Sequence, residues 1–146
     1  MDIRPQAFAH RRPLKSEMAS IHEGAEFVLK ILQEAGLPDV FNRQIRLVVD
    51  EALANAISHG SGVTETSIVL SCQIIDGAVQ ILVEDFQGRV FDPEYFRRIA
   101  LMKDWRKGGR GIQLMEAIMD HMSYLIEEGN HTLLFLQKAL PPQNTP

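Results

Sequence analysis

Glu51, Asn55 and His59 are the residues whose types and spacing first suggest chemistry. They recur every four residues in the segment 51–60, EALANAISHG, which otherwise has the composition of a helix. At about 100° per residue, positions four apart lie roughly 40° apart around a helix, so Glu51 and Asn55 share a face and His59 lies just beyond. An amide oxygen is a ligand for magnesium, and a carboxylate can polarise a hydroxyl or a water. The segment suits a magnesium ion with nucleotide phosphates; the alternative is a solvated helix edge with accidental spacing.

A second group of residues suits phosphates. The segment 106–115, RKGGRGIQLM, places three glycines and three cations directly before a helical pattern. Glycine lets the backbone approach an oxyanion, and the amino terminus of a helix offers unpaired N–H groups and a partial positive charge. The alternative is an ordinary flexible loop that is basic. The two segments complement each other. Residues 106–115 supply a phosphate cradle, and the segment with Glu51 and Asn55 supplies the metal ligand.

Length and composition exclude several classes of function. A chain of 146 residues fits one domain with its own core. A net charge of −4 without a long basic run argues against a dedicated nucleic-acid binder. We expect no membrane span and no signal peptide, because no apolar run is long enough and the first residues lack an apolar core. The cytoplasm is therefore the expected compartment, and the only cysteine, Cys72, is expected to be a buried thiol.

Periodicity predicts three main helices. Apolar residues at helical spacing predict the first over 18–32, with Gly36 and Pro38 as stop signals. A second helix is predicted over 38–58, and a third over 111–121.

Alternation of apolar residues predicts the strands. Residues 68–74 and 79–85 alternate on either side of Asp76-Gly77, which is typical of a hairpin with a tight turn. Two closing strands are predicted over 122–127 and 132–137, around a turn at 128–130. Residues 86–109 form a looser connection, with a short helix predicted after Asp92-Pro93.

This order of elements predicts the fold class. Helices come early and strands mostly late, in hairpins, which indicates an α+β, two-layer sandwich with a mixed, mainly antiparallel sheet covered on one face by helices. Residues 1–140 are predicted to form a single domain, and 141–146 a disordered tail.

Three segments together resemble the anti-sigma-factor serine kinases of bacteria (RsbW-like proteins), within the superfamily of histidine-kinase, gyrase and chaperone ATP-binding domains. Residues 50–60, DEALANAISHG, are similar to the family's N-box, and 109–120, GRGIQLMEAIMD, to its second glycine box. Phe91-Asp92-Pro93 resembles the end of its first glycine box. The resemblance covers about residues 15–138. It implies the Bergerat ATP-binding fold, with ATP between helices and a lid at 92–108.

The resemblance also implies residue roles, with ATP and Mg²⁺ as cofactors. Asn55 would coordinate magnesium, and Glu51 would act as general base toward a protein serine. His59 would close the N-box helix as a structural residue. The segment that would hold the phosphates at the start of the third helix comprises Gly108, Gly109, Arg110, Gly111 and Ile112.

The first glycine box departs from the family pattern. That pattern reads Asp-x-Gly-x-(Gly or Pro)-Phe-Asp-Pro, and its Asp accepts a hydrogen bond from adenine. Residues 84–93 read EDFQGRVFDP, which keeps Gly88 in register but puts Phe86 at the Asp position and Asp85 one residue early. A slip of one residue in a strand turns a side chain to the opposite face. Either a bulge near Gln87 returns Asp85 to the site, or adenine recognition is weakened or lost.

Two functional hypotheses follow. The first is an ATP-dependent serine/threonine protein kinase and anti-sigma-factor-type regulator, which binds a sigma factor or similar regulator and phosphorylates an antagonist of the STAS type. The second is a nucleotide-free or nucleotide-gated interaction module without kinase activity. Family members commonly self-associate, so a homodimer is a further expectation; neither nucleic acid nor membrane is an expected partner.

Overall fold

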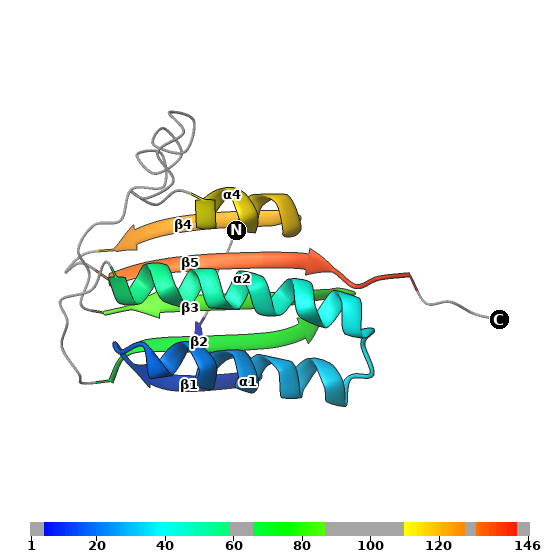
Figure 1. The fold of residues 1–146 in the computed structure, drawn as a ribbon, viewed down its shortest axis with the longest axis horizontal. Coiled ribbons are helices and arrows are strands. Elements are labelled where there is room, and N and C mark those ends of the chain that lie inside the picture. Colours follow the sequence, from blue (N-terminus) through cyan, green and yellow to red (C-terminus); the bar gives the residue numbers. More distant parts are fainter. Residues whose placement is uncertain (1–4, 59–65, 87–109, 128–130, 143–146) are drawn as a thin grey trace.

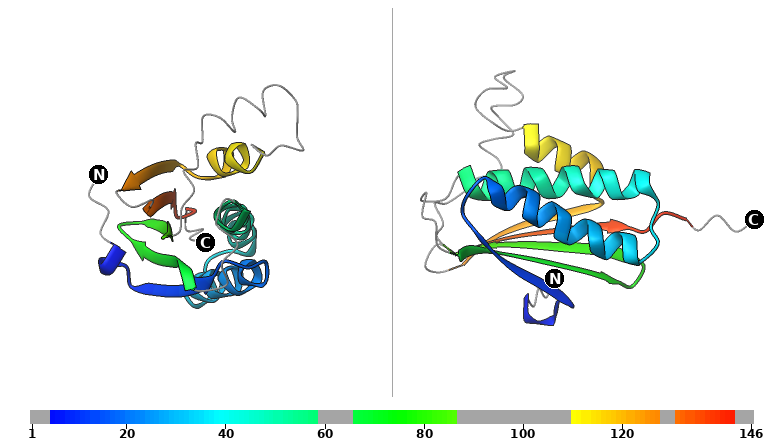
Figure 2. Two further views of the ribbon diagram at one scale, coloured as in Figure 1. Left: turned by 90° about the vertical axis from the view of Figure 1, so that its left-hand side faces the viewer. Right: turned by 60° about the horizontal axis from the view of Figure 1, so that its bottom comes forward.

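The computed structural model describes residues 5–58, 66–86, 110–127 and 131–142. Within these ranges, helices cover one face of a five-stranded sheet (Figures 1 and 2). The predicted lid at 92–108, with its short helix, lies outside the described residues, as do the turn at 128–130 and residues 143–146 of the predicted tail. In chain order the elements are η1 (Pro5–Ala7), β1 (His10–Lys15), α1 (Ala19–Glu34), α2 (Asp39–Ser58), β2 (Thr66–Ile75), β3 (Ala78–Asp85), α4 (Arg110–Ile118), β4 (His121–Glu127) and β5 (His131–Ala139).

The sheet has the strand order β1-β2-β3-β5-β4, and each of its four pairings is antiparallel. The predicted α+β, two-layer fold class is confirmed. The predicted sheet was mixed, but no parallel pair occurs among the described strands. Since α1, α2 and α4 all lie on the same side (Figure 2), the described α-helices cover one face of the sheet and leave the other uncovered.

The β2–β3 hairpin sets the register on which the site depends. Ile75 pairs with Ala78 across the turn, and both turn residues have positive φ, 52° at Asp76 and 74° at Gly77. Turns with two positive φ values match the twist of the flanking strands, and Asp-Gly is a preferred sequence for them. The predicted hairpin and its turn are confirmed.

Strand β1 was not predicted from the sequence. It pairs with β2 at the edge of the sheet and contains Pro13, and only Leu14 in it is buried. With one buried residue there is no alternation to detect, and a proline usually argues against a strand. An edge strand tolerates proline because one of its sides needs no hydrogen-bond partner.

Helix α4 is shorter than predicted, since it ends at Ile118 instead of continuing to His121. Beyond it, the backbone N–H of Asp120 donates to the carbonyl oxygen of Gln137, 2.9 Å away. The chain therefore leaves the helix to join β5, and β4 begins at His121.

The core lies between the helices and the sheet, and Cys72 is part of it. Burial raises the pKa of this thiol to about 12, so the predicted buried thiol is confirmed. On the uncovered face, Phe8 packs against a second apolar cluster beside a ladder of hydrogen-bonded glutamines from β2, β3 and β5. Among the described helices, none is both long and apolar enough to span a membrane. The largest fully buried side chains include Leu14, Leu32, Ile45, Leu53, Ile68, Leu70, Ile81 and Leu136.

Gly24 allows α1 to pack closely on α2 and the sheet. A Cβ at this position would collide with the side chain of Leu53 and would lie 3.1 Å from that of Leu70 and 3.3 Å from that of Leu14. All three leucines are buried in the core, so they have little room to move.

We predict that Gly24→Ala destabilises the domain by about 1–2 kcal/mol, because overpacking outweighs the better helix propensity of alanine. Urea unfolding measures the free energy, with the exposed Glu34→Ala on the same helix as control. A Gly24→Ala variant as stable as the wild type would contradict the close packing.

Candidate functional site

The two sequence motifs meet where α2 lies beside α4. Gly111 is the second residue of α4, and a Cβ on it would lie 2.5 Å from Oε2 of Glu51 and 3.4 Å from Nδ2 of Asn55. Any side chain at this position would displace the Glu51 carboxylate. Glycine therefore lets α4 begin directly against the polar face of α2, and the predicted metal ligand and phosphate cradle are neighbours.

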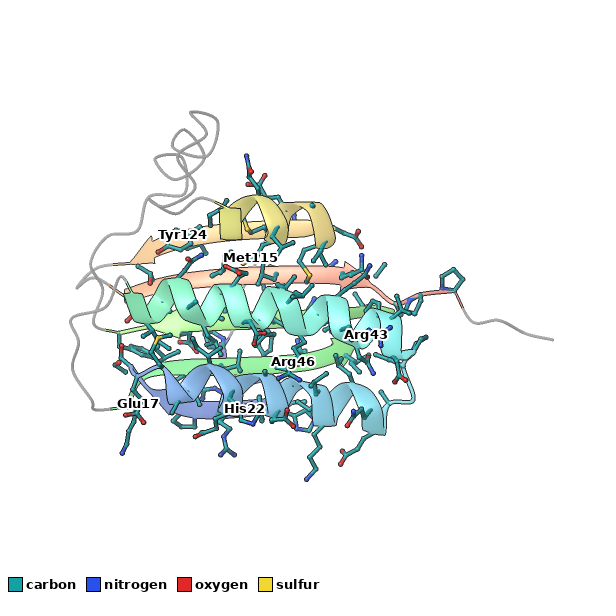
Figure 3. The ribbon with its side chains drawn as sticks, in the orientation of Figure 1. Glu17, His22, Arg43, Arg46, Met115 and Tyr124 are labelled. Atoms are coloured by element: carbon teal, nitrogen blue, oxygen red, sulfur yellow. The ribbon has the colours of Figure 1, made fainter. Side chains whose placement is uncertain are left out.

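The packing of each helix explains this meeting. On α2, Val48, Ala52 and neighbouring apolar residues are buried, which leaves Glu51 and Asn55 half-buried on the flank of that stripe. On α4, Ile112 and Met115 are buried beneath the helix (Met115 is labelled in Figure 3) and fix it on the sheet.

The junction combines groups that suit an anion and a cation together. The first turn of a helix carries N–H groups that no intrahelical carbonyl accepts, and its dipole is positive there. No acidic residue lies in the first turn of α4 to offset that charge. An anion at this helix terminus would be repelled by Glu51 unless a cation lay between them. An amide oxygen and a carboxylate are both ligands for a hard cation, so a magnesium ion with phosphates fits the residues present.

A magnesium site here would use few protein ligands. Among the described residues, no group of three or more His, Cys, Asp and Glu side chains is placed to hold a metal ion. Magnesium commonly keeps several waters and binds through one or two protein oxygens and the phosphates of a nucleotide. Asn55 beside Gly111 matches that arrangement better than a protein cage.

The two adjacent acids of the N-box face different neighbours. Burial raises the pKa of Asp50, while the charges of Arg46 and His22 act in the opposite direction. Figure 3 shows Arg46 on α2 and His22 on α1, so Asp50 faces the seam between these helices. Glu51, about 100° further around α2, faces α4. Of the two, Glu51 is the acid that lies at the junction with α4.

Strand β3 places Asp85 on the helix-covered face. It alternates with Val83 and Ile81, which lie in the core under the helices, and its side chain is buried, with 6% of the residue exposed. Pairing with β2 is regular up to Asp85, so no bulge within β3 is needed to bring it there. Gln87, where a bulge was considered, lies outside the described residues.

The neighbours of Asp85 confirm this orientation. Glu84 points to the uncovered face, where its Oε1 lies 3.6 Å from Nη2 of Arg11. Phe86, the residue in register with the family's Asp, is 46% exposed, and its N–H donates to the carbonyl oxygen of Ser67. Of Asp85 and Phe86, Asp85 is therefore the residue buried beneath the helix layer.

Thr132 is a candidate site residue that the sequence analysis missed. It pairs directly with Asp85 across β3 and β5 on the helix-covered face, and 5% of it is exposed. The carboxyl ends of β3 and α2, the start of β5 and the start of α4 all lie at one end of the domain (Figure 1). The sequence does not reveal that Thr132 lies beside Asp85, because the β3–β5 pairing that brings them together joins strands far apart in the sequence.

The structure brings together only part of the predicted site. Glu51, Asn55 and Gly111 are in one place, and Asp85 lies at the same end of the sheet. The side chain of Ile112 is buried, so its backbone is the part available to a ligand. Arg110 begins α4. Gly88, Gly108, Gly109 and His59 lie outside the described residues, and their roles stay predictions.

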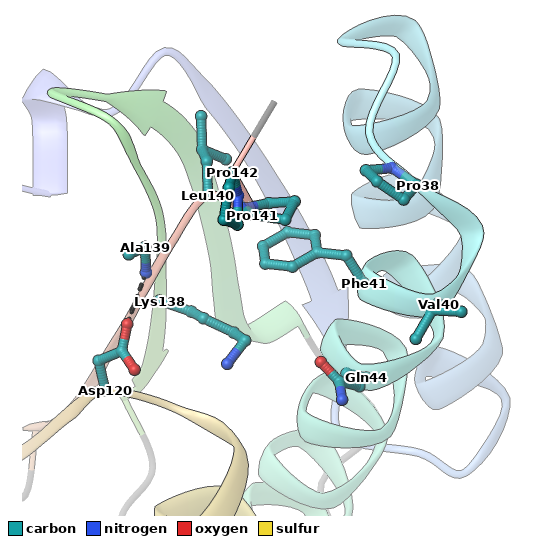
Figure 4. A pocket seen from close by; sticks show the side chains of 10 residues that line it. All are labelled: Pro38, Val40, Phe41, Gln44, Asp120, Lys138, Ala139, Leu140, Pro141 and Pro142. Atoms are coloured by element: carbon teal, nitrogen blue, oxygen red, sulfur yellow. Dashed lines mark hydrogen bonds between the residues drawn. The ribbon is translucent and has the colours of Figure 1, made fainter. Parts of the chain in front are cut away.

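A separate groove of about 410 Å³ lies at the other end of α2 (Figure 4). Its walls include Phe41 and Leu140, with Lys138 and Asp120 beside them. Phe41 and Asn55 are about 21 Å apart along the axis of α2, at 1.5 Å per residue. Its volume suits a small ligand, but it contains none of the predicted site residues.

The comparisons with known proteins agree with this geometry. Residues 14–137 match the family model of the histidine kinase-like ATPase domain. The chain belongs to this family. Its relatives include the anti-sigma F factor of Clostridium novyi (strain NT), 32% identical over 103 residues, which are 66% of this chain and 69% of the relative. The anti-sigma F factor of Geobacillus stearothermophilus is 32% identical over 105 residues, 70% of this chain and 72% of the relative.

Solved structures support the fold of this histidine kinase-like ATPase domain. The RsbU and RsbW domains of a Mycobacterium tuberculosis protein match with a TM-score of 0.68 at 18% identity, covering 91% of this chain and 33% of that one. A chain of the SiaB–SiaC complex of Pseudomonas aeruginosa also matches, with a TM-score of 0.62 at 12% identity and 92% of each chain covered. The resemblance to RsbW-like proteins read from the motifs is confirmed.

We predict that Gly111→Ala and Glu51→Ala are energetically coupled. In the wild type, the added Cβ must displace the Glu51 carboxylate, which offsets the helix propensity gained by alanine. In the Glu51→Ala background the carboxylate is absent, so Gly111→Ala is more favourable to the free energy of unfolding there than in the wild type. A double-mutant cycle by urea unfolding should give a coupling of about 0.5 kcal/mol or more. Additive effects would show that the two residues do not meet.

Proposed function

We propose that this domain binds ATP with magnesium at the α2–α4 junction and acts as an ATP-dependent serine/threonine protein kinase. The observation that carries the proposal is the approach of Gly111 to Glu51 and Asn55. It puts a helix amino terminus, a carboxylate and an amide within reach of one ligand. Membership of the histidine kinase-like ATPase family supports the nucleotide, though fold alone does not fix an activity.

The residues divide into two parts of a nucleotide site. The first N–H groups of α4, at Gly111 and its neighbours, donate hydrogen bonds to phosphate oxygens. Asn55 coordinates magnesium through its amide oxygen. Asp85, with Thr132 opposite it, accepts a hydrogen bond from the adenine amino group in this proposal. Magnesium, when bound, neutralises phosphate charge and so permits phosphates to lie beside Glu51.

Phosphoryl transfer then requires positioning and one proton acceptor. The terminal phosphoryl group passes from ATP to a serine hydroxyl, the bond to the β-phosphate breaks, and the hydroxyl proton goes to Glu51 as general base. The half-buried position of Glu51 beside the start of α4 supports this role, because a carboxylate there is near the proposed phosphate site and partly exposed to solvent.

We further propose a regulatory role for the domain. The two relatives described above are named anti-sigma F factors, and this chain covers more than two thirds of the length of each. By analogy, the partners are a sigma factor or similar regulator and a STAS-type antagonist that provides the serine. An interaction module that has lost nucleotide binding is the competing account, and its basis is the altered first glycine box. The burial of Asp85 on the helix-covered face favours the nucleotide-binding account.

We predict that Mg²⁺ and ATP raise the melting temperature of the wild-type domain and that Asn55→Ala abolishes the shift. Ligand at a hundred times its dissociation constant adds about 2.7 kcal/mol to the free energy of unfolding. Gln44→Ala, an exposed amide on the same helix, is the matched control and should keep the full shift. If neither ATP nor ADP shifts the wild type, the protein is an interaction module.

We predict that Glu51→Ala separates transfer from binding. Loss of a general base should slow transfer of labelled phosphate to the antagonist by about 10²- to 10⁴-fold. Partner binding, measured by titration, should remain, and the exposed Glu34→Ala should behave as wild type. Transfer at the wild-type rate in Glu51→Ala would remove the general base from the mechanism.

A further inference from the structure

Helix α4 must be held in position by contacts outside itself. It has only nine residues, and helices this short are unstable alone in water. No basic residue lies in its last turn to compensate the negative end of its dipole. Yet its first turn must stay against Glu51 and Asn55 for the proposed phosphate site to exist.

The far end of α4 is tied to β5 by two side chains. The ammonium of Lys138 donates to the carbonyl oxygen of Ile118, the last residue of the helix, at 2.7 Å. The backbone N–H of Ala139 donates to Oδ2 of Asp120, also at 2.7 Å. We call these two contacts the clasp; Figure 4 shows Asp120 bonded to Ala139, with the Lys138 side chain beside them at the wall of the groove.

Lys138 supplies what α4 lacks. A hydrogen bond from an ammonium is shorter and stronger than a neutral one, and this one is partly buried. A cation at the carboxyl end of a helix also stabilises the dipole. One side chain from β5 therefore satisfies a terminal carbonyl and fixes the helix relative to the sheet.

We propose that Lys138 is a positioning residue for the phosphate end of the nucleotide site, acting through α4. This inference rests on the proposed function. The helix is about 13 Å long at 1.5 Å per residue, so a shift at its clasped end also moves Gly111 at the other end. On β3, Lys138 and Ala139 pair with Val79 and Ala78, whereas Asp85 lies at the opposite end of that strand, so the adenine end should be unaffected.

The fold does not depend on Lys138 alone. Ile112 and Met115 anchor α4 in the core, so loss of the ammonium should leave the helix in place but less firmly positioned. The expected effect is therefore on affinity for phosphates, and global unfolding is not expected.

The test compares Lys138→Met, which keeps most of the stem, with Lys138→Arg, which keeps the cation and the donor. Lys30→Met, the same change at an exposed site on α1, is the matched control. Binding of ATP with Mg²⁺ is measured by calorimetry, and binding of adenosine by NMR titration, well below the melting temperature. Lys138→Met should bind ATP about three- to tenfold more weakly, with adenosine unchanged; Lys138→Arg and Lys30→Met should match the wild type.

The outcomes separate this inference from the function on which it rests. Wild-type protein that binds neither ATP nor adenosine overturns the proposed function and the role of Lys138 together. If the wild type binds ATP and Lys138→Met binds it with the same affinity, the role of Lys138 is overturned and the proposed function is not. Equal weakening of ATP and adenosine, or no rescue by Lys138→Arg, also overturns it, because the lysine would then be a general structural residue.

Discussion

The approach of the start of α4 to the polar face of α2 is the constraint on which the rest of the structure depends. A Cβ at Gly111 would displace the carboxylate of Glu51, so a glycine is required where the two helices meet. The meeting needs α2 to be fixed by its buried stripe and α4 to be fixed by Ile112 and Met115. Core packing thus places a carboxylate, an amide and a helix amino terminus together, and Lys138 at the opposite end holds the short helix in place.

Strand register determines which face of the sheet Asp85 occupies. The Asp76-Gly77 turn fixes the pairing of β2 with β3, and that pairing sends Asp85 and Glu84 to opposite faces. A single-residue slip would exchange them and leave the helix-covered face without its buried aspartate. Although the first glycine box departs from the family pattern, the helix-covered face therefore still carries an aspartate. That residue, Asp85, lies on a regular strand, opposite Thr132.

Local features were predictable from the sequence, and long-range ones were not. The helix with Glu51 and Asn55 and the β2–β3 hairpin were predictable because their patterns are complete within short segments. Strand β1 was missed because only Leu14 in it is buried, and Thr132 because its partner on β3 is distant in the sequence. The end of α4 was misplaced because a backbone bond to β5, at Gln137, ends the helix, and helical periodicity does not encode that bond.

The measurement that tests the central claim most directly is an NMR titration of ¹⁵N-labelled protein with ADP and Mg²⁺. The account predicts that the largest amide shifts fall on Glu51, Gly111 and Asp85, at the end of the domain where α2 and β3 finish and α4 starts. Shifts confined to Val40 and Phe41 would place the ligand in the groove at the opposite end of α2. That result, or the absence of any shift at saturating nucleotide, would contradict a phosphate site built from α2 and α4.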